Sequence, residues 1–368
     1  MKVFHLLPSM QSGGVEQVVL ELGKGLSEQG IENVVISDSG RLVDQLISEG
    51  SRHIKMNIGK KSPSTLLKIP ALRKLFLEEK PDIIHLHSRV PAWAAYLAWK
   101  TLPKDKRPGL VSTVHGFYSI NKWSAIMTKG QRVVAVSNCI KDYILRSYPD
   151  TSQDKIRVIP NAIDPELYNP NYRPSAEWIN GLLVTYPELK GKWTICLPGR
   201  LTRLKGQLLI IPILKDLIEA GVPAHILLVG EAKKGKEAYK EEIVRRLEEN
   251  GLSEHVTWLG HRTDLRKVLA ACDVTISLST SPESFGKTTL EALALGRPVA
   301  GFAHGGVAEQ LHSFLPEGNI PVEDTTAMAK QLTDWYHNPP QIPQTIPSPY
   351  KMTDMIDAHI KVYQELLR

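Results

Sequence analysis

The chain has 368 residues, of which 42% are hydrophobic and 23% charged, a balance typical of a folded protein with more than one domain. No apolar run reaches the roughly 18 residues that a membrane span needs, and the start is too short for a signal peptide. Cys139, Cys196 and Cys272 have no metal-type spacing, which favours buried, reduced thiols in a cytoplasmic protein.

The net charge of +6 is unevenly distributed along the chain. Residues 1–165 carry 23 Lys and Arg against 15 Asp and Glu, a net +8, whereas the remainder carries −2. This indicates an anionic partner for the first half, or only a basic solvated face. Nucleic acid is not expected, because no aromatic–basic motif of the usual modules appears.

One basic stretch, Ser64–Lys80, has the pattern of an amphipathic helix. Such a helix could lie on an anionic membrane surface, which would make the protein peripheral on the inner membrane. Alternatively, it packs Leu67, Leu75 and Phe76 inward. The residues that would form an acceptor or membrane face are Lys60, Lys61, Lys68, Arg73 and Lys74.

The first half alternates apolar strands with helical patterns, which is typical of βαβ units and a parallel sheet. A segment rich in Pro, Asn and Tyr, from Pro160 to about Tyr186, predicts an irregular linker. The expected strands are 3–7, 33–37, 83–87, 110–115 and 132–137, and one expected helix is 14–29.

A second βαβ series follows the linker. Its expected strands are 193–198, 225–230, 256–259, 274–278 and 298–302, and its expected helices are 205–220, 236–250, 264–271 and 288–295. Residues 337–349 should be irregular, and a last helix should cover about 352–367. Two α/β domains of Rossmann-like, doubly wound type are therefore predicted, one over residues 1–165 and one over 166–349. A ligand is expected in a cleft between them, at the carboxyl ends of the strands.

Two candidate site features follow strands of the first half. Gly13 and Gly14 come after the first strand and open a helix, where backbone N–H groups can meet an anion. A tight strand–helix turn would explain them equally well. His115 ends another strand and could hydrogen-bond a substrate hydroxyl or act as an acid or base, although a lone histidine is more often structural.

Two further features follow strands of the second half. Arg200 and Lys205 flank a loop that begins at Gly199, where a guanidinium fork and an ammonium could clamp a diphosphate. Glu283 and Glu291 lie eight residues apart around a glycine and a helix start, so that the carboxylates suit hydroxyls and the helix start suits phosphate. In the structural alternative, all four are surface or helix-start charges.

Two other patterns are rejected as sites. Gly230 begins a G-x-x-x-x-G-K run, but Glu237 stands where a phosphate-binding loop needs Ser or Thr. His85 and His87 share a strand face and could ligate a metal, but no third ligand is expected nearby, which favours core packing. No Asp-x-Asp is present either, so neither a metal nor another cofactor is expected.

Together these residues resemble the family 4 retaining glycosyltransferases of the two-domain GT-B fold, over nearly the whole chain. The resemblance implies that the last helix, about 350–368, packs back onto the first domain. The most specific feature is the spacing of Glu283 and Glu291, which resembles the family's E-x7-E motif. Gly305–Gly306 also matches, although His304 departs from the small or acidic residue of many relatives and leaves the sugar open. The wider pattern is similar to bacterial transferases of the lipopolysaccharide core.

The resemblance implies a nucleotide-sugar donor, with UDP favoured over GDP, and a saccharide or anionic lipid-linked acceptor. His115 would contact the donor sugar, Arg200 and Lys205 the diphosphate, Glu283 the sugar hydroxyls and Glu291 the ribose. Other residues implied in donor binding are Gly13, Gly14, Gly199, Gly230, His261, Arg262, Ser284, Phe285, Gly286 and Lys287.

Three other functions fit parts of the pattern. A sugar-nucleotide epimerase of the same fold would turn over its substrate without an acceptor. A P-loop ATPase would need magnesium and is disfavoured by Glu237. A non-catalytic nucleotide-binding protein would bind without forming a product.

Overall fold

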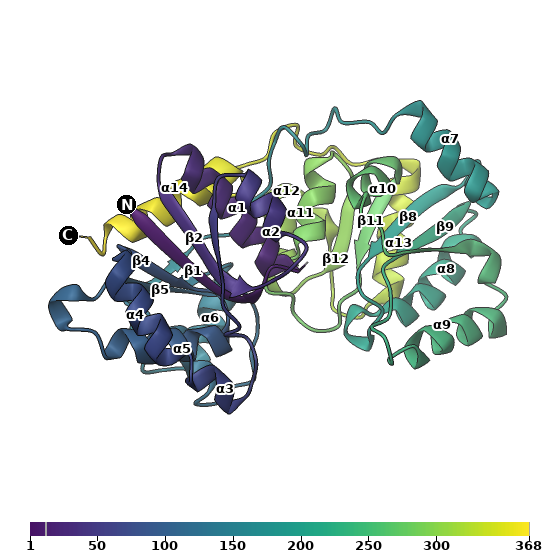
Figure 1. Cartoon of the computed structure of the whole chain (residues 1–368). Helices are drawn as coiled ribbons and strands as arrows, with labels where there is room; N and C mark the ends of the chain where they lie inside the picture. Colours follow the sequence, from purple (N-terminus) through teal and green to yellow (C-terminus); the bar gives the residue numbers. More distant parts are fainter. Residues whose placement is uncertain (12, 368) are drawn as a thin grey trace. The chain divides into compact units, whose positions relative to one another are not determined.

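The structure is a computed structural model that describes residues 1–11 and 13–367. It divides into two compact units, which are described separately. The first comprises Met1–Ala162 and Ser348–Arg368, and the second Ile163–Pro347. Both are built around a parallel sheet flanked by helices (Figure 1).

The first unit contains a seven-stranded parallel sheet in its described part. In sheet order the strands are β3 (Arg52–Lys55), β2 (Glu32–Asp38), β1 (Lys2–Ser9), β4 (Ile83–Leu86), β5 (Gly109–Val114), β6 (Arg132–Ala135) and β7 (Ile156–Val158). The helices are α1 (Gly14–Glu28), α2 (Val43–Ser48), α3 (Pro63–Leu66), α4 (Ile69–Glu79), α5 (Arg89–Lys100), α6 (Asn138–Ser147) and α14 (Met352–Gln364).

The C-terminal helix α14 belongs to the first unit and lies beside α1 (Figure 1). Met355, Ile356 and Tyr363 join the core formed with Val3 and Leu22. At its end, Glu365 accepts hydrogen bonds from Arg132 and Arg157 of neighbouring strands. The last segment of the chain therefore completes the core of the unit that contains the first.

The second unit contains a six-stranded parallel sheet. In sheet order the strands are β10 (Val256–Gly260), β9 (Ala224–Val229), β8 (Trp193–Pro198), β11 (Val274–Ser277), β12 (Val299–Phe302) and β13 (Asn319–Ile320). The helices are α7 (Ala176–Thr185), α8 (Ile210–Glu219), α9 (Ala238–Glu249), α10 (Leu265–Ala271), α11 (Lys287–Ala294), α12 (Gly305–Phe314) and α13 (Thr325–His337).

Three predicted elements were wrong in extent. The segment predicted as an irregular linker contains helix α7, which begins where the hydroxyl of Ser175 accepts from the backbone N–H of Trp178. The helix predicted from Lys205 begins only at Ile210, after two 3-10 turns separated by Gly206 in the left-handed region.

The basic amphipathic stretch is also not one helix. It is divided into α3 and α4, with Leu67 and Lys68 between them and a proline at the start of each helix. In α4, Leu72 and Phe76 are buried, and Phe76 packs on Phe4. Leu66 and Leu67 instead are 54% and 78% exposed. The prediction that this stretch packs its apolar side chains inward is therefore confirmed for α4, but not for the leucines at the end of α3 and in the following turn.

The cysteines differ in part from the expectation of three buried thiols. None of these three cysteines forms a disulfide, but Cys139 is only half-buried. Cys196 and Cys272 are buried neighbours, and the thiol of Cys272 together with burial raises the pKa of Cys196.

The contact between α1 and α14 gives a stability prediction. A Cβ at Gly25 would lie 2.0 Å from the Cδ1 atom of Ile356, so we expect Gly25→Val to lower the free energy of unfolding of the first unit by about 1–3 kcal/mol through overpacking. Urea unfolding measures this. Lys24→Val adds the same side chain at an exposed position of α1 and should change stability by less than about 1 kcal/mol. The loss in Gly25→Val should shrink when Ile356→Ala is added, and simple additivity of the two would contradict the contact.

Candidate functional site

The second sheet reverses its strand order between β8 and β11. In sheets of this kind, ligands bind beyond the carboxyl ends of the strands at such a switch point. The loop after β8 carries Arg200 and Lys205, and the loop after β11 carries Glu283. A backbone hydrogen bond of 2.9 Å from Thr280 N to Leu204 O joins the two loops.

Lys205 and Glu283, predicted separately from two motifs, form an ion pair at this point. The Lys205 Nζ atom lies 2.8 Å from Glu283 Oε1, and the side chains are 28% and 24% exposed. The hydroxyl of Ser279 donates to the same carboxylate oxygen at 2.6 Å. Burial alone would raise the pKa of Glu283, but the Lys205 charge and the hydrogen bonds from Lys205 and Ser279 outweigh it and hold the pKa below its usual value. Glu283 is therefore ionised and fixed in place.

The Gly305–Gly306 pair supports the backbone of this glutamate. Gly306 N donates to Glu283 O at 2.7 Å. A Cβ at Gly305, whose φ is +62°, would lie 2.4 Å from the same carbonyl oxygen, and one at Gly306 would lie 2.5 Å from Phe285 Cα. Both positions therefore need glycine, since backbone meets backbone there. The sequence alone indicates no structural role for these two glycines. The loops that they bring together are far apart in the chain, so no local sequence pattern reveals the contact.

His304, the residue that departs from the family pattern, lies in the same cluster. Its Nε2 atom donates to the carbonyl oxygen of Ser279 at 2.7 Å. It thereby joins the start of α12 to the loop after β11, next to the Ser279–Glu283 hydrogen bond.

Arg200 offers a contrast to the paired Lys205. Its side chain is exposed, and within the described part of the chain its guanidinium has no hydrogen-bond or carboxylate partner. Its carbonyl oxygen accepts from Gln207 Nε2 at 3.0 Å, which fixes the backbone. Gly230, on the next loop, has φ +142°, and a Cβ there would lie 2.1 Å from the Gly199 oxygen. Glycine at position 230 thus allows the loops after β8 and β9 to approach each other next to Arg200 in the chain.

Glu291 is the fifth residue of α11, about one turn from its start, and is 8% exposed. The hydroxyl of Tyr168 donates to its Oε1 atom at 3.4 Å. This supplies a partner for a buried carboxylate, whose burial without one would be costly. Tyr168 itself lies in the segment predicted as a linker, so sequence reasoning did not identify it.

The residues after β10 are also held in place. Arg262 donates from Nε and Nη2 to Asp264, both at 2.8 Å, and Trp178 of α7 donates to the same carboxylate. His261 is exposed beside them. Ser284, Phe285 and Gly286 lead directly into α11, which starts at Lys287.

In the first unit, Gly13 and Gly14 lie at the start of α1, directly after β1, and His115 directly follows β5. The expectation that His85 and His87 have no third imidazole nearby was wrong. The ring nitrogens of His5, His85 and His87 that could serve as ligands lie within 4.8 Å of one another. His5 comes from β1, 80 residues earlier, which is why spacing within one strand could not reveal it.

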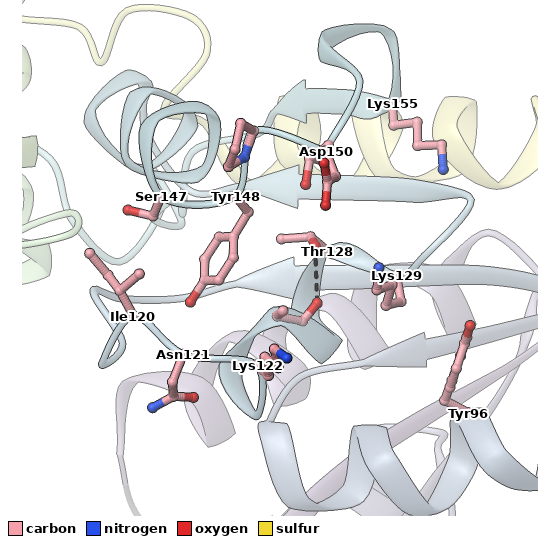
Figure 2. Close-up of a pocket in the computed structure, with 13 residues that line it drawn as sticks. Tyr96, Ile120, Asn121, Lys122, Thr128, Lys129, Ser147, Tyr148, Asp150 and Lys155 are labelled. Atoms are coloured by element: carbon pink, nitrogen blue, oxygen red, sulfur yellow. Dashed lines mark hydrogen bonds between the residues drawn. The ribbon is translucent and has the colours of Figure 1, made fainter.

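A hollow of about 440 Å³ lies elsewhere on the first unit, outside the residues predicted for the sugar donor (Figure 2). Lys122, Lys129 and Lys155 are exposed at this hollow, against one carboxylate, Asp150. The complete lining is Tyr96, Ile120, Asn121, Lys122, Ala125, Thr128, Lys129, Ser147, Tyr148, Pro149, Asp150, Thr151 and Lys155. Its charge is therefore net positive.

No helix among the described residues is long and apolar enough to cross a membrane.

Comparison with known proteins identifies relatives of both units. The chain is 26% identical over 329 residues to a human protein named as part of phosphatidylinositol N-acetylglucosaminyltransferase, an alignment that covers 84% of this chain and 62% of the human protein. The chain thus spans about three-fifths of that relative's length. Among solved structures, a glycosyltransferase from Rickettsia africae matches with a TM-score of 0.88 and 26% identity, covering 100% of this chain and 98% of that one.

Anabaena HepE, solved in complex with UDP-glucose, matches with a TM-score of 0.74, covering 100% of this chain and 95% of that one, and at 21% identity it supports the fold alone. The fold is therefore GT-B, as expected from the resemblance. Residues 12–167 match the model of Glycosyltransferase Family 4, and residues 185–351 match that of Glycosyl transferases group 1. These two matches cover most of the chain, which belongs to the family 4-type glycosyltransferases.

Proposed function

We propose that this chain transfers a sugar from a nucleoside-diphosphate sugar to a saccharide or lipid-linked acceptor with retention of anomeric configuration. The observation that carries the proposal is the Lys205–Glu283 ion pair at the switch point of the second sheet. It brings a cation suited to phosphate and a carboxylate suited to sugar hydroxyls to one place, beside the available guanidinium of Arg200.

The sugar donor is a UDP-sugar in this proposal. The solved HepE complex contains UDP-glucose, and the human relative is by its name part of an N-acetylglucosaminyltransferase. UDP-N-acetylglucosamine is therefore the first donor to test, with other UDP- and GDP-sugars behind it.

Binding of the diphosphate would change the partners of Lys205. An ammonium has three N–H donors, so Lys205 can turn to phosphate oxygens without leaving Glu283 entirely. Glu283 would then accept from sugar hydroxyls while Ser279 keeps its carboxylate oriented. The resting ion pair would thus prevent an unpaired charge from being buried before the donor arrives.

The chemical step would depend on electrostatic stabilisation. As the bond between the anomeric carbon and the phosphate oxygen breaks, negative charge grows on the leaving diphosphate. Arg200, Lys205 and the N-terminus of α11 supply the opposing charge in place of a metal. The acceptor hydroxyl would attack the same face of the sugar and pass its proton to the leaving phosphate oxygen.

Arg200→Ala tests this clamp. We expect it to lower the rate at which UDP is released from UDP-N-acetylglucosamine, with water accepting the sugar in place of the acceptor, by about 100-fold or more, because a charge-stabilising group is lost. Arg203→Ala is the matched control, since Arg203 belongs to the same loop but is 70% exposed and pairs with Glu242. Equal rates in wild type and Arg200→Ala would contradict the clamp. A wild type that releases no UDP from this sugar nucleotide would contradict N-acetylglucosamine as the transferred sugar.

The acceptor in this proposal is an anionic lipid-linked molecule at a membrane surface. The exposed residues Lys60, Lys61 and Lys68 flank in sequence the two leucines, Leu66 and Leu67, that α3 and the following turn expose. Exposed apolar side chains among cations suit the headgroup region of an anionic bilayer. Arg73 and Lys74 of α4 are the other two basic residues proposed for this surface, and the lipopolysaccharide core is one acceptor of this class.

Leu66→Ser with Leu67→Ser tests the surface. We expect the double variant to bind phosphatidylglycerol-containing vesicles about tenfold more weakly in sedimentation, because two apolar side chains no longer leave water. Ile47→Ser is the control, since Ile47 is 53% exposed on α2 of the same unit. Unchanged binding by the double variant, or no vesicle binding by wild type, would contradict a membrane-facing role.

A further inference from the structure

Five imidazoles gather at the carboxyl end of the first sheet. His5 and His85 are paired across β1 and β4, and His87 follows two residues after His85 on the same side. His115 follows β5, and His359 approaches from α14. All except His115 are at most 3% exposed.

Hydrogen bonds divide these imidazoles into two sets. His85 is occupied on both nitrogens, with Nδ1 2.8 Å from the Tyr363 hydroxyl and Nε2 2.6 Å from the Thr113 hydroxyl. His5, His87 and His115 instead form a chain, in which His5 Nδ1 lies 2.9 Å from His87 Nε2 and His87 Nδ1 lies 3.1 Å from His115 Nε2.

The cluster is not built as an open metal site. Of the ring nitrogens of His5, His85 and His87, all except His5 Nε2 have a hydrogen-bond partner within the described chain. To bind a metal ion together, the three imidazoles would have to break several of these hydrogen bonds where water cannot replace them. The observed chain of bonds is the simpler arrangement.

The imidazoles of His5, His87 and His115 are neutral. Burial, followed by repulsion from His359, lowers the pKa of His5 and of His115 to about 3. Burial lowers the pKa of His87 well below its usual value too. A neutral imidazole has one N–H and one bare nitrogen, so the three rings must all point their protons in the same direction along the chain.

Only two proton arrangements satisfy both bonds. In one, the N–H groups point from His5 towards His115, which leaves a bare nitrogen at His5 Nε2. In the other they point inward and place an N–H on His5 Nε2, which is buried without an acceptor. A buried N–H without a partner is rarer and more costly than an unused acceptor, so the outward arrangement is favoured.

We propose that His5 and His87 are positioning residues that hold His115 as the neutral tautomer protonated on Nδ1. His115 Nδ1 is the nitrogen that has no partner within the described chain, so it can donate a hydrogen bond to a ligand oxygen. It cannot serve there as the base that removes a proton. This inference rests on the proposed function, because it gives His115 the role of a donor to a sugar oxygen.

Long-range proton–nitrogen NMR of protein labelled with ¹⁵N-histidine tests the inference at pH 7. The His115 signals are assigned by their loss in His115→Asn. We expect wild type to show the proton on Nδ1 of His115. In His87→Leu the restraint is lost, and His115 should shift to the Nε2-protonated form that a free imidazole prefers in water. His87→Gln, whose amide can still donate to His115 Nε2, should restore the Nδ1 form.

His85→Leu is the matched control, because His85 is buried in the same cluster but is not hydrogen-bonded to His5, His87 or His115. It should leave the His115 tautomer unchanged. A wild-type spectrum with the proton on Nε2, or with both nitrogens protonated, overturns the proposal even if His87→Leu does not fold. The spectrum requires no ligand or turnover, so its failure would leave the proposed transferase function standing, and failure of UDP release would leave the tautomer standing.

Discussion

The carboxyl ends of parallel strands lie along one edge of a sheet, and this constraint determines where the functional side chains of both units lie. In the second unit it places the loops after β8 and β11 next to each other at the reversal of strand order. A cation from one loop and a carboxylate from the other then meet, although 78 residues separate them. In the first unit it gathers histidines from β1, β4 and β5 at the same edge.

Around Glu283, the neighbouring loops are adapted to keep one carboxylate ionised and immobile. Lys205 balances its charge, Ser279 donates to it, and Gly305 and Gly306 allow α12 to hold its backbone. Around His115 the neighbouring imidazoles are neutral, because a cation in that cluster would be buried without a counter-charge. The proposed transferase would thus meet its sugar donor with groups that are already oriented.

The sequence predicted the central strands well, because strands buried on both faces are continuous apolar runs, as in Trp193–Pro198. It missed β3, β7 and β13, which are two to four residues long and include charged residues such as Arg52 and Lys55. Helix α7 was hidden in a segment whose composition resembles a linker. Motif spacing indicated Lys205, Glu283 and Glu291 as candidates, and the structure brings the first two together. The Lys205–Glu283 pairing, the Tyr168 contact and the place of His5 could not be found, because they depend on tertiary contacts between distant segments.

The central claim is that the second unit binds a sugar nucleotide without a metal. A thermal-shift panel of UDP, GDP, ADP and their common sugar conjugates, with and without Mg²⁺, tests it most directly on wild type and Glu291→Ala. At about a hundred times its dissociation constant, a ligand should stabilise by roughly 2.7 kcal/mol. We expect a higher melting temperature with one UDP- or GDP-sugar, independent of Mg²⁺ and lost in Glu291→Ala. Stabilisation by ATP with Mg²⁺ alone, or by none of these compounds, would contradict it.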